Sequence, residues 1–371
     1  MQKSMTSRER VLAALDHQET DRIPFSMTFG VNTPAKEDLR QYFQMDSLEA
    51  VEDYLNRFND IRWVSPRYVG PDDRNRTVDN ETTVDVWGVE RKAISYGEGE
   101  YAEIYHHPLA EVQTERELKD YEWPSSVWWD VTQIKKMVEG INEKDEYAIA
   151  VGNGNIFETT WYMRGFDKTL TDLIRKPDLV WTIMEKVTDY YIAYFEKILE
   201  EVGELIDIVF TADDLGGQEG LLMSLDLWEK MIKPHHKKLN KVIHECGQGE
   251  GRRDGVKIMY HSDGSIMEAI PGLIDINIDI LQALQFELQG MDAKKIKEKY
   301  GDQLCFNGGV SVQQTLPYGT TEDVKEEVKG LIEILGNNGG YILGPSHAIQ
   351  AGTPPENIVA LLETMEDYYP F

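Results

Sequence analysis

The sequence predicts an α/β fold, a TIM (β/α)8 barrel that carries a decorated N-terminal segment. Short apolar runs recur through the second part of the chain, at 147–151, 206–210, 256–260, 274–281, 304–306 and 341–343. Amphipathic stretches with helical spacing separate most of these runs, for example 179–200 and 321–335. Short buried strands that alternate with helices are typical of βα units in a parallel sheet. Eight such units close into a barrel whose chemistry lies in the loops after the strands.

The first element along the chain is a helix that begins after Thr6. Thr6 and Glu9 have the spacing of a capping box, and the apolar residues Val11, Leu12 and Leu15 follow at helical intervals. Residues 21–24 (DRIP) stop this helix, and an extended run is expected from 25 to 29. From 31 to about 143 the pattern is irregular. We therefore predict one domain over residues 1–371, in which about 31–143 form decorating insertions and a cap.

Composition excludes several classes of function. The formal net charge of -28 and a pI near 4.6 repel phosphate backbones, so nucleic acid is not an expected partner. No apolar stretch approaches the roughly 18 residues of a membrane span, and the opening MQKSMTSRER lacks the apolar centre of a signal peptide. Two cysteines are too few for a disulfide framework or a four-thiolate zinc site. We expect a cytoplasmic protein; the oligomeric state stays open, a homodimer included.

Two histidines and one carboxylate form the most informative pattern. His261 and Asp263 are two residues apart at the end of an apolar run, and residues at that spacing point to the same face of a strand. His347 follows the run 341–343 in the same way. Because parallel strands end at the same edge, the three side chains are expected to converge as a metal site with an open position. The alternative is that each histidine is a hydrogen-bonded loop residue.

Other polar residues also follow predicted strands. Asp213, Asp214 and Gln218 come after the run 206–210, while Gln285 and Asn307 follow the runs ending at 281 and 306. Such convergence at one end of a barrel is what an active-site face needs, although any one loop alone is compatible with ordinary turn chemistry.

An aromatic and basic cluster follows the first of the regular strands. Trp161, Tyr162 and Arg164 would supply an aromatic wall and an anion anchor, with ordinary helix packing as the alternative. His235, His236 and His244 are expected to be surface or core residues rather than ligands. Cys305, on a strand, is most simply a small buried residue.

Several motifs occur in an order and spacing that resemble a known family. They are RERVLAAL at 8–15, DRIP at 21–24, DVWG at 85–88, DDLG at 213–216, HSDG at 261–264, GG at 308–309, LPYGT at 316–320 and the segment 339–347. With these motifs the chain resembles the uroporphyrinogen decarboxylase superfamily over nearly its whole length, and more closely its corrinoid-dependent methyltransferase branch. The resemblance implies a TIM barrel, in agreement with the strand pattern.

Two departures from the family pattern bear on the reaction. Decarboxylases of this family hold porphyrin carboxylates partly with an arginine-rich segment after the first strand, and residues 30–35 here contain no arginine. In the methyltransferase branch zinc is held by a His-x-Cys pair and a later cysteine. Here Asp263 stands at the first cysteine position and His347 at or near the second. Porphyrinogen decarboxylation is thus disfavoured, and the identity of the metal, with zinc as the first expectation, stays open.

The resemblance together with the replaced ligands implies O-demethylation. A His/Asp/His site is harder and more Lewis acidic than a thiolate site, and it suits an ether oxygen, as in a methoxylated aromatic donor. Cob(I)alamin on a separate corrinoid protein would accept the methyl group, because the chain has no Asp-x-His-x-x-Gly cobalamin motif. In this interpretation Asp213 or Asp214 protonates or orients the leaving oxygen, while Gln218, Gln285 and Asn307 position substrate. A porphyrinogen decarboxylase, a thiol methyltransferase that uses a coenzyme M-like acceptor and a non-catalytic binding barrel are the alternatives.

Overall fold

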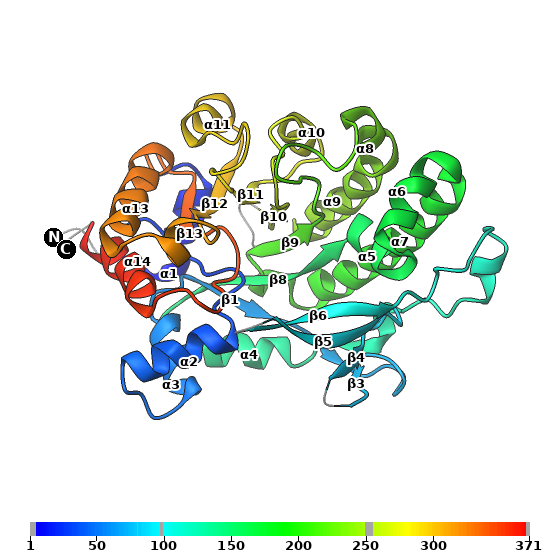
Figure 1. Ribbon diagram of the computed structural model, residues 1–371, viewed down its shortest axis with the longest axis horizontal. Helices are drawn as coiled ribbons and strands as arrows, with labels where there is room; N and C mark the ends of the chain where they lie inside the picture. Colours follow the sequence, from blue (N-terminus) through cyan, green and yellow to red (C-terminus); the bar gives the residue numbers. More distant parts are fainter. Residues whose placement is uncertain (1–4, 80, 97–98, 249–254, 369–371) are drawn as a thin grey trace.

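A curled parallel sheet forms the centre of the protein (Figure 1). The structure is a computed structural model that describes residues 5–368 except 80, 97–98 and 249–254. Seven strands follow in the order β1-β8-β9-β10-β11-β12-β13. Their bounds are β1 Ile61–Val64, β8 Ala148–Asn155, β9 Ile208–Ala212, β10 Lys257–His261, β11 Ile280–Ala283, β12 Cys305–Val310 and β13 Tyr341–Pro345. Every neighbouring pair is parallel, as expected for successive βα units.

The chain around Phe25 takes the eighth position, between β13 and β1. The Leu343 amide donates to the Pro24 carbonyl at 2.9 Å, and the Asp60 amide donates to the Phe25 carbonyl at 2.9 Å. Phe25 forms a single parallel bridge to Leu343, so the extended run expected over 25–29 is shorter than predicted. A turn at residues 28–29 ends it. The predicted TIM barrel is confirmed, with its first strand reduced to this bridge.

A buried carboxylate, that of Asp60, holds in place the segment that closes the barrel. Asp60 is fully buried, and its oxygens accept hydrogen bonds from Arg10 at 2.8 Å and from the Phe25 amide at 2.8 Å. Arg22 donates to both Asp60 oxygens, at 2.7 and 2.8 Å. One carboxylate thus joins the first helix, the bridging segment and the start of β1. Charged groups are tolerated in such a place because each is paired and hydrogen-bonded.

Asp60→Asn is expected to destabilise the protein by about 3 kcal/mol or more, because the buried Arg10 and the partly buried Arg22 lose the negative charge that they share. Urea unfolding followed by circular dichroism would measure the change. Asp189→Asn, at an exposed ion pair with Lys238, is the matched control and should stay within about 0.5 kcal/mol of the original. Equal unfolding midpoints for the two variants would contradict a structural role for Asp60.

Helices cover the outer face of the sheet (Figure 1). They are α1 Ser7–Leu15, α2 Thr33–Tyr42, α3 Leu48–Asn56, α4 Ile134–Ile141, α5 Phe157–Arg164, α6 Phe166–Arg175, α7 Pro177–Val202, α8 Leu225–Met231, α9 Lys233–Gly247, α10 Ile270–Asp275, α11 Ala293–Tyr300, α12 Thr315–Tyr318, α13 Thr321–Leu335 and α14 Pro355–Asp367, with 3-10 helices η1 Glu117–Asp120, η2 Ser126–Trp128 and η3 Gly203–Leu205. The capping box at Thr6 and Glu9 is present. The stretch 321–335 coincides with α13, and 179–200 lies within α7.

Two sequence expectations differ from the structure. The run 274–281 is not one strand, because α10 ends at Asp275 and β11 begins at Ile280. Both elements are buried, and periodicity alone does not separate a buried helix end from a buried strand. The range 31–143 is also not decoration throughout, since it contains the barrel strand β1. That strand has only four residues, and Arg62 interrupts its apolar pattern.

The remainder of 31–143 lies outside the barrel sheet. A four-stranded antiparallel sheet contains β3 Arg76–Thr77, β4 Thr82–Val84, β5 Glu90–Tyr96 and β6 Gly99–His106, and a two-stranded ribbon pairs β2 Arg67–Tyr68 with β7 Trp129–Asp130. Figure 1 shows β3 to β6, in blue to cyan, below the strands of the barrel sheet in this view. Across the described residues, no helix combines the length and apolar character that a membrane crossing requires.

Candidate metal centre

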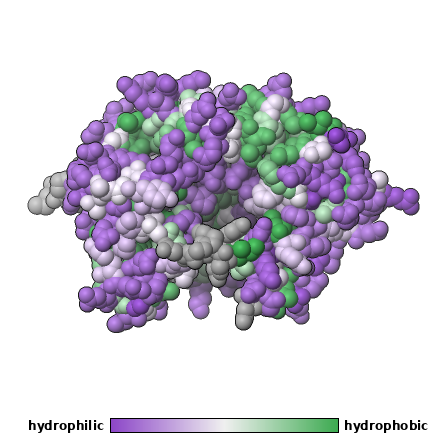
Figure 2. All heavy atoms as spheres, viewed as in Figure 1, coloured by the Kyte–Doolittle hydropathy of each residue, from purple (hydrophilic) through white to green (hydrophobic). Residues whose placement is uncertain are grey.

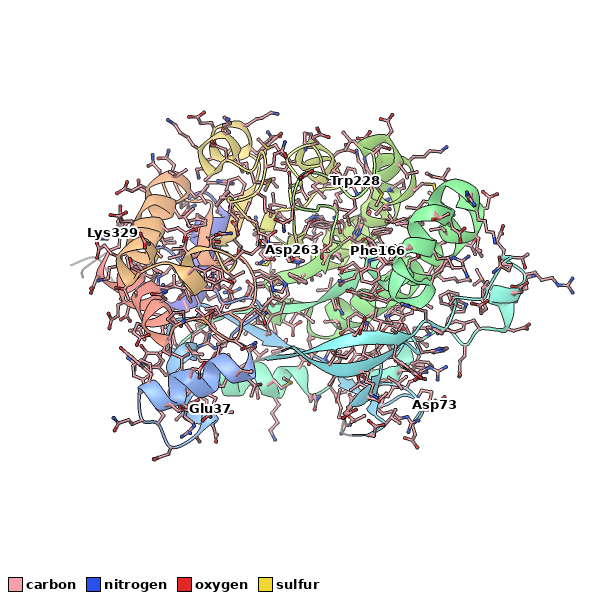
Figure 3. All side chains as sticks on the ribbon, viewed as in Figure 1. Glu37, Asp73, Phe166, Trp228, Asp263 and Lys329 are labelled. Carbon is pink, nitrogen blue, oxygen red and sulfur yellow. The ribbon has the colours of Figure 1, made fainter. Side chains whose placement is uncertain are left out.

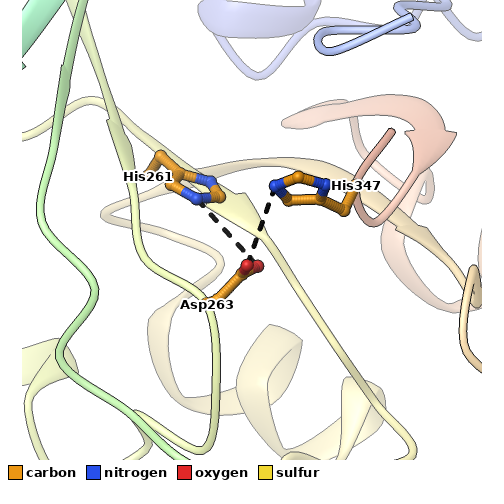
Figure 4. Close-up of side chains that lie close together, drawn as sticks. All are labelled: His261, Asp263 and His347. Atoms are coloured by element: carbon orange, nitrogen blue, oxygen red, sulfur yellow. Dashed lines mark ion pairs between the residues drawn. The ribbon is translucent and has the colours of Figure 1, made fainter. Parts of the chain in front are cut away.

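His261, Asp263 and His347 converge at the carboxyl end of the sheet (Figure 4). His261 is the last residue of β10, and His347 follows β13 by two residues. One ligand atom from each of the three residues lies within 4.8 Å of the others. Nε2 of His347 is 3.8 Å from one Asp263 oxygen, and Nε2 of His261 is 4.0 Å from the other. The structure therefore brings together the three residues that the sequence pattern selected, and Figure 3 labels Asp263 near the centre of the molecule.

A neighbouring strand orients the His261 ring. Gln282 is the register partner of His261 on β11, and its Oε1 is 2.5 Å from His261 Nδ1. Because this oxygen is an acceptor, it accepts a hydrogen bond from Nδ1, and the ring is held with Nε2 toward Asp214 and Asp263. Outer hydrogen bonds of this kind fix the orientation of metal-binding histidines. Sequence reasoning missed Gln282, although its place opposite His261 in parallel register is a usable signal.

The electrostatics of the cluster suit a cation. Burial raises the pKa of the Asp263 carboxyl above its ordinary value, and burial lowers the pKa of His347, which keeps that imidazole neutral. Among the described residues none donates a hydrogen bond to Asp263 Oδ1, a buried oxygen. An unpartnered buried carboxylate oxygen beside two imidazoles is a site where a metal ion would satisfy all three groups.

Phe29 covers the cluster from the turn after the barrel-closing segment. Its ring stacks on the His347 ring, with centroids 4.5 Å apart and planes inclined by 17°. The same ring meets His261 edge-on at 4.9 Å. Asn307 holds this turn, because its side-chain oxygen accepts a hydrogen bond from Thr28 Oγ1 at 2.8 Å. An apolar ring against both imidazoles excludes water from one side of the site.

A cavity of about 630 Å³ opens beside the two histidines. Val64, Asn155, Ala212 and His261, the last residues of four neighbouring strands, contribute to its wall, so it lies at the barrel face that carries chemistry in this fold. Figure 2 shows the molecule hollowed near its centre in this view. The wall also includes four aromatic side chains, Phe29, Trp63, Tyr162 and Phe210, and two acidic ones, Glu158 and Asp214.

Glu158 is an acid that sequence reasoning missed. Its two oxygens accept hydrogen bonds from Tyr162 Oη at 2.7 Å and from Asn155 Nδ2 at 2.6 Å. Burial raises the pKa of Glu158 to about 8, and the charges of Asp214 and Asp213 add to this effect. A carboxyl with this pKa is protonated near neutral pH. Glu158 lies on α5, three residues after the end of β8, and a position in the first turn of a helix gives no distinctive spacing in the sequence.

Asp213 and Asp214 point in different directions. Asp213 is fully buried; its oxygens accept the Phe157 and Glu158 amides, each at 2.8 Å, and one lies 2.5 Å from His236 Nε2. Asp213 therefore supports the start of α5, and the structure does not place it on the cavity wall, contrary to the expectation that it meets substrate. Asp214 does line the cavity, and its Oδ1 is 3.5 Å from His261 Nε2. His236 is a core residue, as expected.

The three residues expected to position substrate do not line this cavity in the described part of the chain. Gln218 is exposed. Gln285 is buried, and its side-chain oxygen accepts the Gly264 amide at 2.7 Å. Asn307 is buried against Thr28 and the Ile342 carbonyl. The side-chain amides of Gln285 and Asn307 thus hold backbone and turns around the site, because each already has a partner within the fold.

The cluster on α5 divides in the same way. Tyr162 lines the cavity, whereas Trp161 packs edge-on against Phe166 at 5.3 Å. Arg164 is buried, pairs with Asp172 at 2.5 Å, and donates to two backbone carbonyls. The expectation of Arg164 as an anion anchor is therefore not supported, since its donors already have partners. Ordinary helix packing, the stated alternative, describes Trp161 and Arg164.

The uroporphyrinogen decarboxylase family matches residues 6–368. The chain belongs to this family. It is 26% identical over 196 residues to the methylcobamide:CoM methyltransferase MtaA of Methanosarcina barkeri. The aligned residues make up 53% of this chain and 51% of that protein. It is 24% identical over 203 residues to a uroporphyrinogen decarboxylase of Pseudoalteromonas translucida, covering 55% and 52%. The chain thus spans about half the length of these curated relatives.

A solved structure supports the family fold over the full chain. A methyltransferase from Methanosarcina mazei superposes with a TM-score of 0.70 and 19% identity, covering 99% of this chain and 100% of that one. At this identity the likeness concerns the fold. The predicted resemblance to the superfamily and to its methyltransferase branch is confirmed, and family members that act as decarboxylases are also among the relatives.

Proposed function

We propose that this protein is a methyltransferase that cleaves an aryl methyl ether and passes the methyl group to cob(I)alamin on a separate corrinoid protein. The observation that carries the proposal is the convergence of His261, Asp263 and His347 beside an aromatic-walled cavity. The methylcobamide:CoM methyltransferase among the relatives supports methyl transfer to or from a corrinoid. It does not specify the donor, which we infer from the ligand set.

The residues fit a metal ion. Two imidazoles, one of them with its Nε2 toward Asp263 and Asp214, and a carboxylate with an oxygen that accepts no hydrogen bond give three N/O ligands and leave an open position, which is the ligand count of catalytic zinc sites. We propose zinc, held by His261, Asp263 and His347. When bound, the ion supplies Lewis acidity toward the ether oxygen of the donor.

The side chains of the protein then account for binding and proton transfer. Phe29, Trp63 and Phe210 present ring faces and edges against which an aryl group would pack. In the reaction the methyl C–O bond breaks as cobalt of cob(I)alamin takes the methyl group, and the bonding pair stays on oxygen. Glu158, protonated below pH 8, would donate its proton to that aryloxide. Asp214, which follows the neighbouring strand β9, would orient the same oxygen.

Incubation of the purified protein with cob(I)alamin and a panel of methoxylated aromatics is the direct test. Methylcobalamin and the corresponding phenol should form in equal amounts. Transfer only to a coenzyme M-like thiol would favour a thiol methyltransferase. The methylcobamide:CoM methyltransferase among the relatives favours that alternative, whereas the ligand cluster contains no cysteine. Cys305 lies at the start of β12, where burial raises the pKa of its thiol to about 12.

Uroporphyrinogen is expected not to be a substrate. The first turn after the closing segment holds no arginine over 30–35. The described residues of the cavity wall include Asp214 and no lysine or arginine, so the wall offers a polycarboxylate little positive charge. Anaerobic incubation with uroporphyrinogen, followed by chromatography of the oxidised porphyrins, measures this. Coproporphyrin above a no-enzyme control would contradict the expectation and favour the decarboxylase function of several relatives.

Asp263→Cys is expected to retain the metal while ether cleavage slows by about tenfold or more, which corresponds to ~1.4 kcal/mol in the barrier. A thiolate donates more charge than a carboxylate and lowers the Lewis acidity of the ion. Metal analysis and single-turnover rates of methylcobalamin formation measure the two effects separately. Asp189→Cys, at an exposed position, is the control for adding a thiol. Unchanged or faster ether cleavage with full metal content would show that acidity of the ion does not limit the reaction.

A further inference from the structure

A second cavity of about 620 Å³ lies next to the first. Its wall is unusually rich in aromatic side chains from α7, the β2–β7 ribbon and the loop before β5. They are Tyr68, Trp87, Trp129, Tyr190, Tyr191 and Tyr194. Several of these rings already pack on one another; Trp87 meets Tyr190 edge-on at 4.8 Å, and Tyr190 is stacked on Tyr194 at 6.0 Å. The wall is therefore a set of mutually supported rings.

The two cavities adjoin along one edge. Ser65, Asn153, Asn155 and Tyr162 contribute to the walls of both. Tyr162 lies between the two cavities. Its hydroxyl donates a hydrogen bond to Glu158 on the side of the first cavity. On the other side the Arg91 guanidinium lies 5.0 Å from its ring centroid. A ligand with its reacting group near His261 would thus find the aromatic wall beyond Tyr162.

The charges around the two cavities disfavour an anionic ligand. Apart from the two histidines, Arg91 is the one cationic side chain among the described residues that line either cavity. Its guanidinium is paired with Asp85 at 2.6 Å. Asp214 is acidic and lies on the wall of the first cavity, as Asp85 does on the wall of the second. A carboxylate entering the second cavity would lose water without gaining a free cationic partner, which is costly.

We infer that the two cavities form one binding site for an uncharged aromatic methyl ether, with the methoxyl group at the histidines and the aromatic body against the second cavity. The inference rests on the proposed function and names its substrate class. Ring stacking and edge-to-face contacts with Trp87, Trp129 and the tyrosines of α7 would bind the aryl group without a charged anchor. Methoxybenzenes and methoxyphenols are thereby selected over methoxybenzoates.

Calorimetric binding of two matched probes, without cobalamin, tests the selection. 1,2-Dimethoxybenzene and 3,4-dimethoxybenzoate differ by one carboxylate. The dissociation constant of the neutral probe should be lower than that of the benzoate by about tenfold or more. Quenching of tryptophan fluorescence is a second readout, because Trp87 and Trp129 line the second cavity. Equal or tighter binding of the benzoate, or binding of neither probe, would overturn the inference.

Two variants locate the site. Ser65→Trp places a large ring where the cavities adjoin, and it should weaken binding of the neutral probe about tenfold or more. Asp189→Trp adds the same ring at an exposed position outside both cavities and should leave binding unchanged. Asp85→Asn keeps Oδ1 for the Trp87 and Val89 amides and removes the partner of Arg91. This variant should therefore gain about tenfold in affinity for the benzoate. Thermal melts check that each variant folds.

The outcomes separate the inference from the proposed function. Selective binding of the neutral probe without any methyl transfer would keep the binding site and remove the proposed reaction. Methyl transfer from the benzoate alone would keep the reaction and overturn the inferred substrate class. Unchanged binding in Ser65→Trp, or no gain for the benzoate in Asp85→Asn, would also count against the inferred site.

Discussion

His261→Ala and His347→Ala should each lose the metal ion and reduce methyl transfer to the uncatalysed rate. Either substitution leaves one imidazole and Asp263, too few ligands to hold an ion against water. Metal content of the purified variants should fall from about one ion per chain to near zero. Methylcobalamin formation from a methoxylated aromatic should fall with it. The loss is expected to be large because the same ion is proposed to hold the ether oxygen and to accept the charge that develops on it.

Two further variants make this result specific. Gln282→Leu removes the oxygen that holds His261 Nδ1 and should weaken metal affinity about 10- to 100-fold without abolishing binding. His244→Ala, on α9 with its ring hydrogen-bonded to the Asn277 carbonyl, is the control and should keep both metal and activity. Full activity in metal-free protein, or in His261→Ala, would contradict the metal site and would mean that the three residues only bind substrate.

The convergence of His261, Asp263 and His347 could be predicted from sequence, although not every step of the reasoning applies. Residues two apart on a strand share a face, which predicts that His261 and Asp263 lie together. In the structure β10 ends at His261, so Asp263 reaches the same place from the loop that follows the strand. His347 joins them because parallel strands end at one edge of the sheet, and β10 and β13 both belong to it. No side-chain detail was needed for this step.

Neighbouring acids show where sequence reasoning ends. Asp213 and Asp214 follow the same strand, and the sequence does not indicate which one reaches the cavity. The structure decides it through distant partners: the amides at the start of α5 and His236 on α9 surround Asp213. The choice depends on the packing of helices against the barrel, which no local pattern in the chain encodes.

Arginine partners are equally hidden in the sequence. The sequence suggests that Arg164 binds an anion, yet the guanidinium forms an ion pair with Asp172, which lies eight residues further along on the next helix. A spacing of eight residues does not predict an ion pair on a single helix, because only side chains three or four residues apart are neighbours there. The pair forms only because Gly165 separates two helices, α5 and α6. A turn of this kind changes which charges are free, and with it the expected substrate.

Methyl transfer should decline as the pH rises through about 8, and Glu158→Gln should lower the rate about 100-fold and remove that decline. Burial, followed by the charges of Asp214 and Asp213, raises the pKa of Glu158, so the protonated form predominates below pH 8 and is lost above it. The proton is needed on the acid when the aryloxide leaves, and glutamine has none to give. Single-turnover rates from about pH 6 to about pH 9.5 measure both effects.

Tyr162→Phe separates proton donation by Glu158 from a merely structural role. The Tyr162 hydroxyl donates to Glu158 Oε1 at 2.7 Å, and this hydrogen bond lowers the pKa of the carboxyl by stabilising its charged form. Loss of the hydroxyl should therefore raise the pKa and shift the decline in rate to higher pH, while the rate at low pH is largely retained. Asn155 donates to the other oxygen, so the carboxyl stays oriented. A pH profile that is the same in the original protein, Tyr162→Phe and Glu158→Gln would exclude Glu158 as the proton donor, because a structural role alone leaves the midpoint where it was.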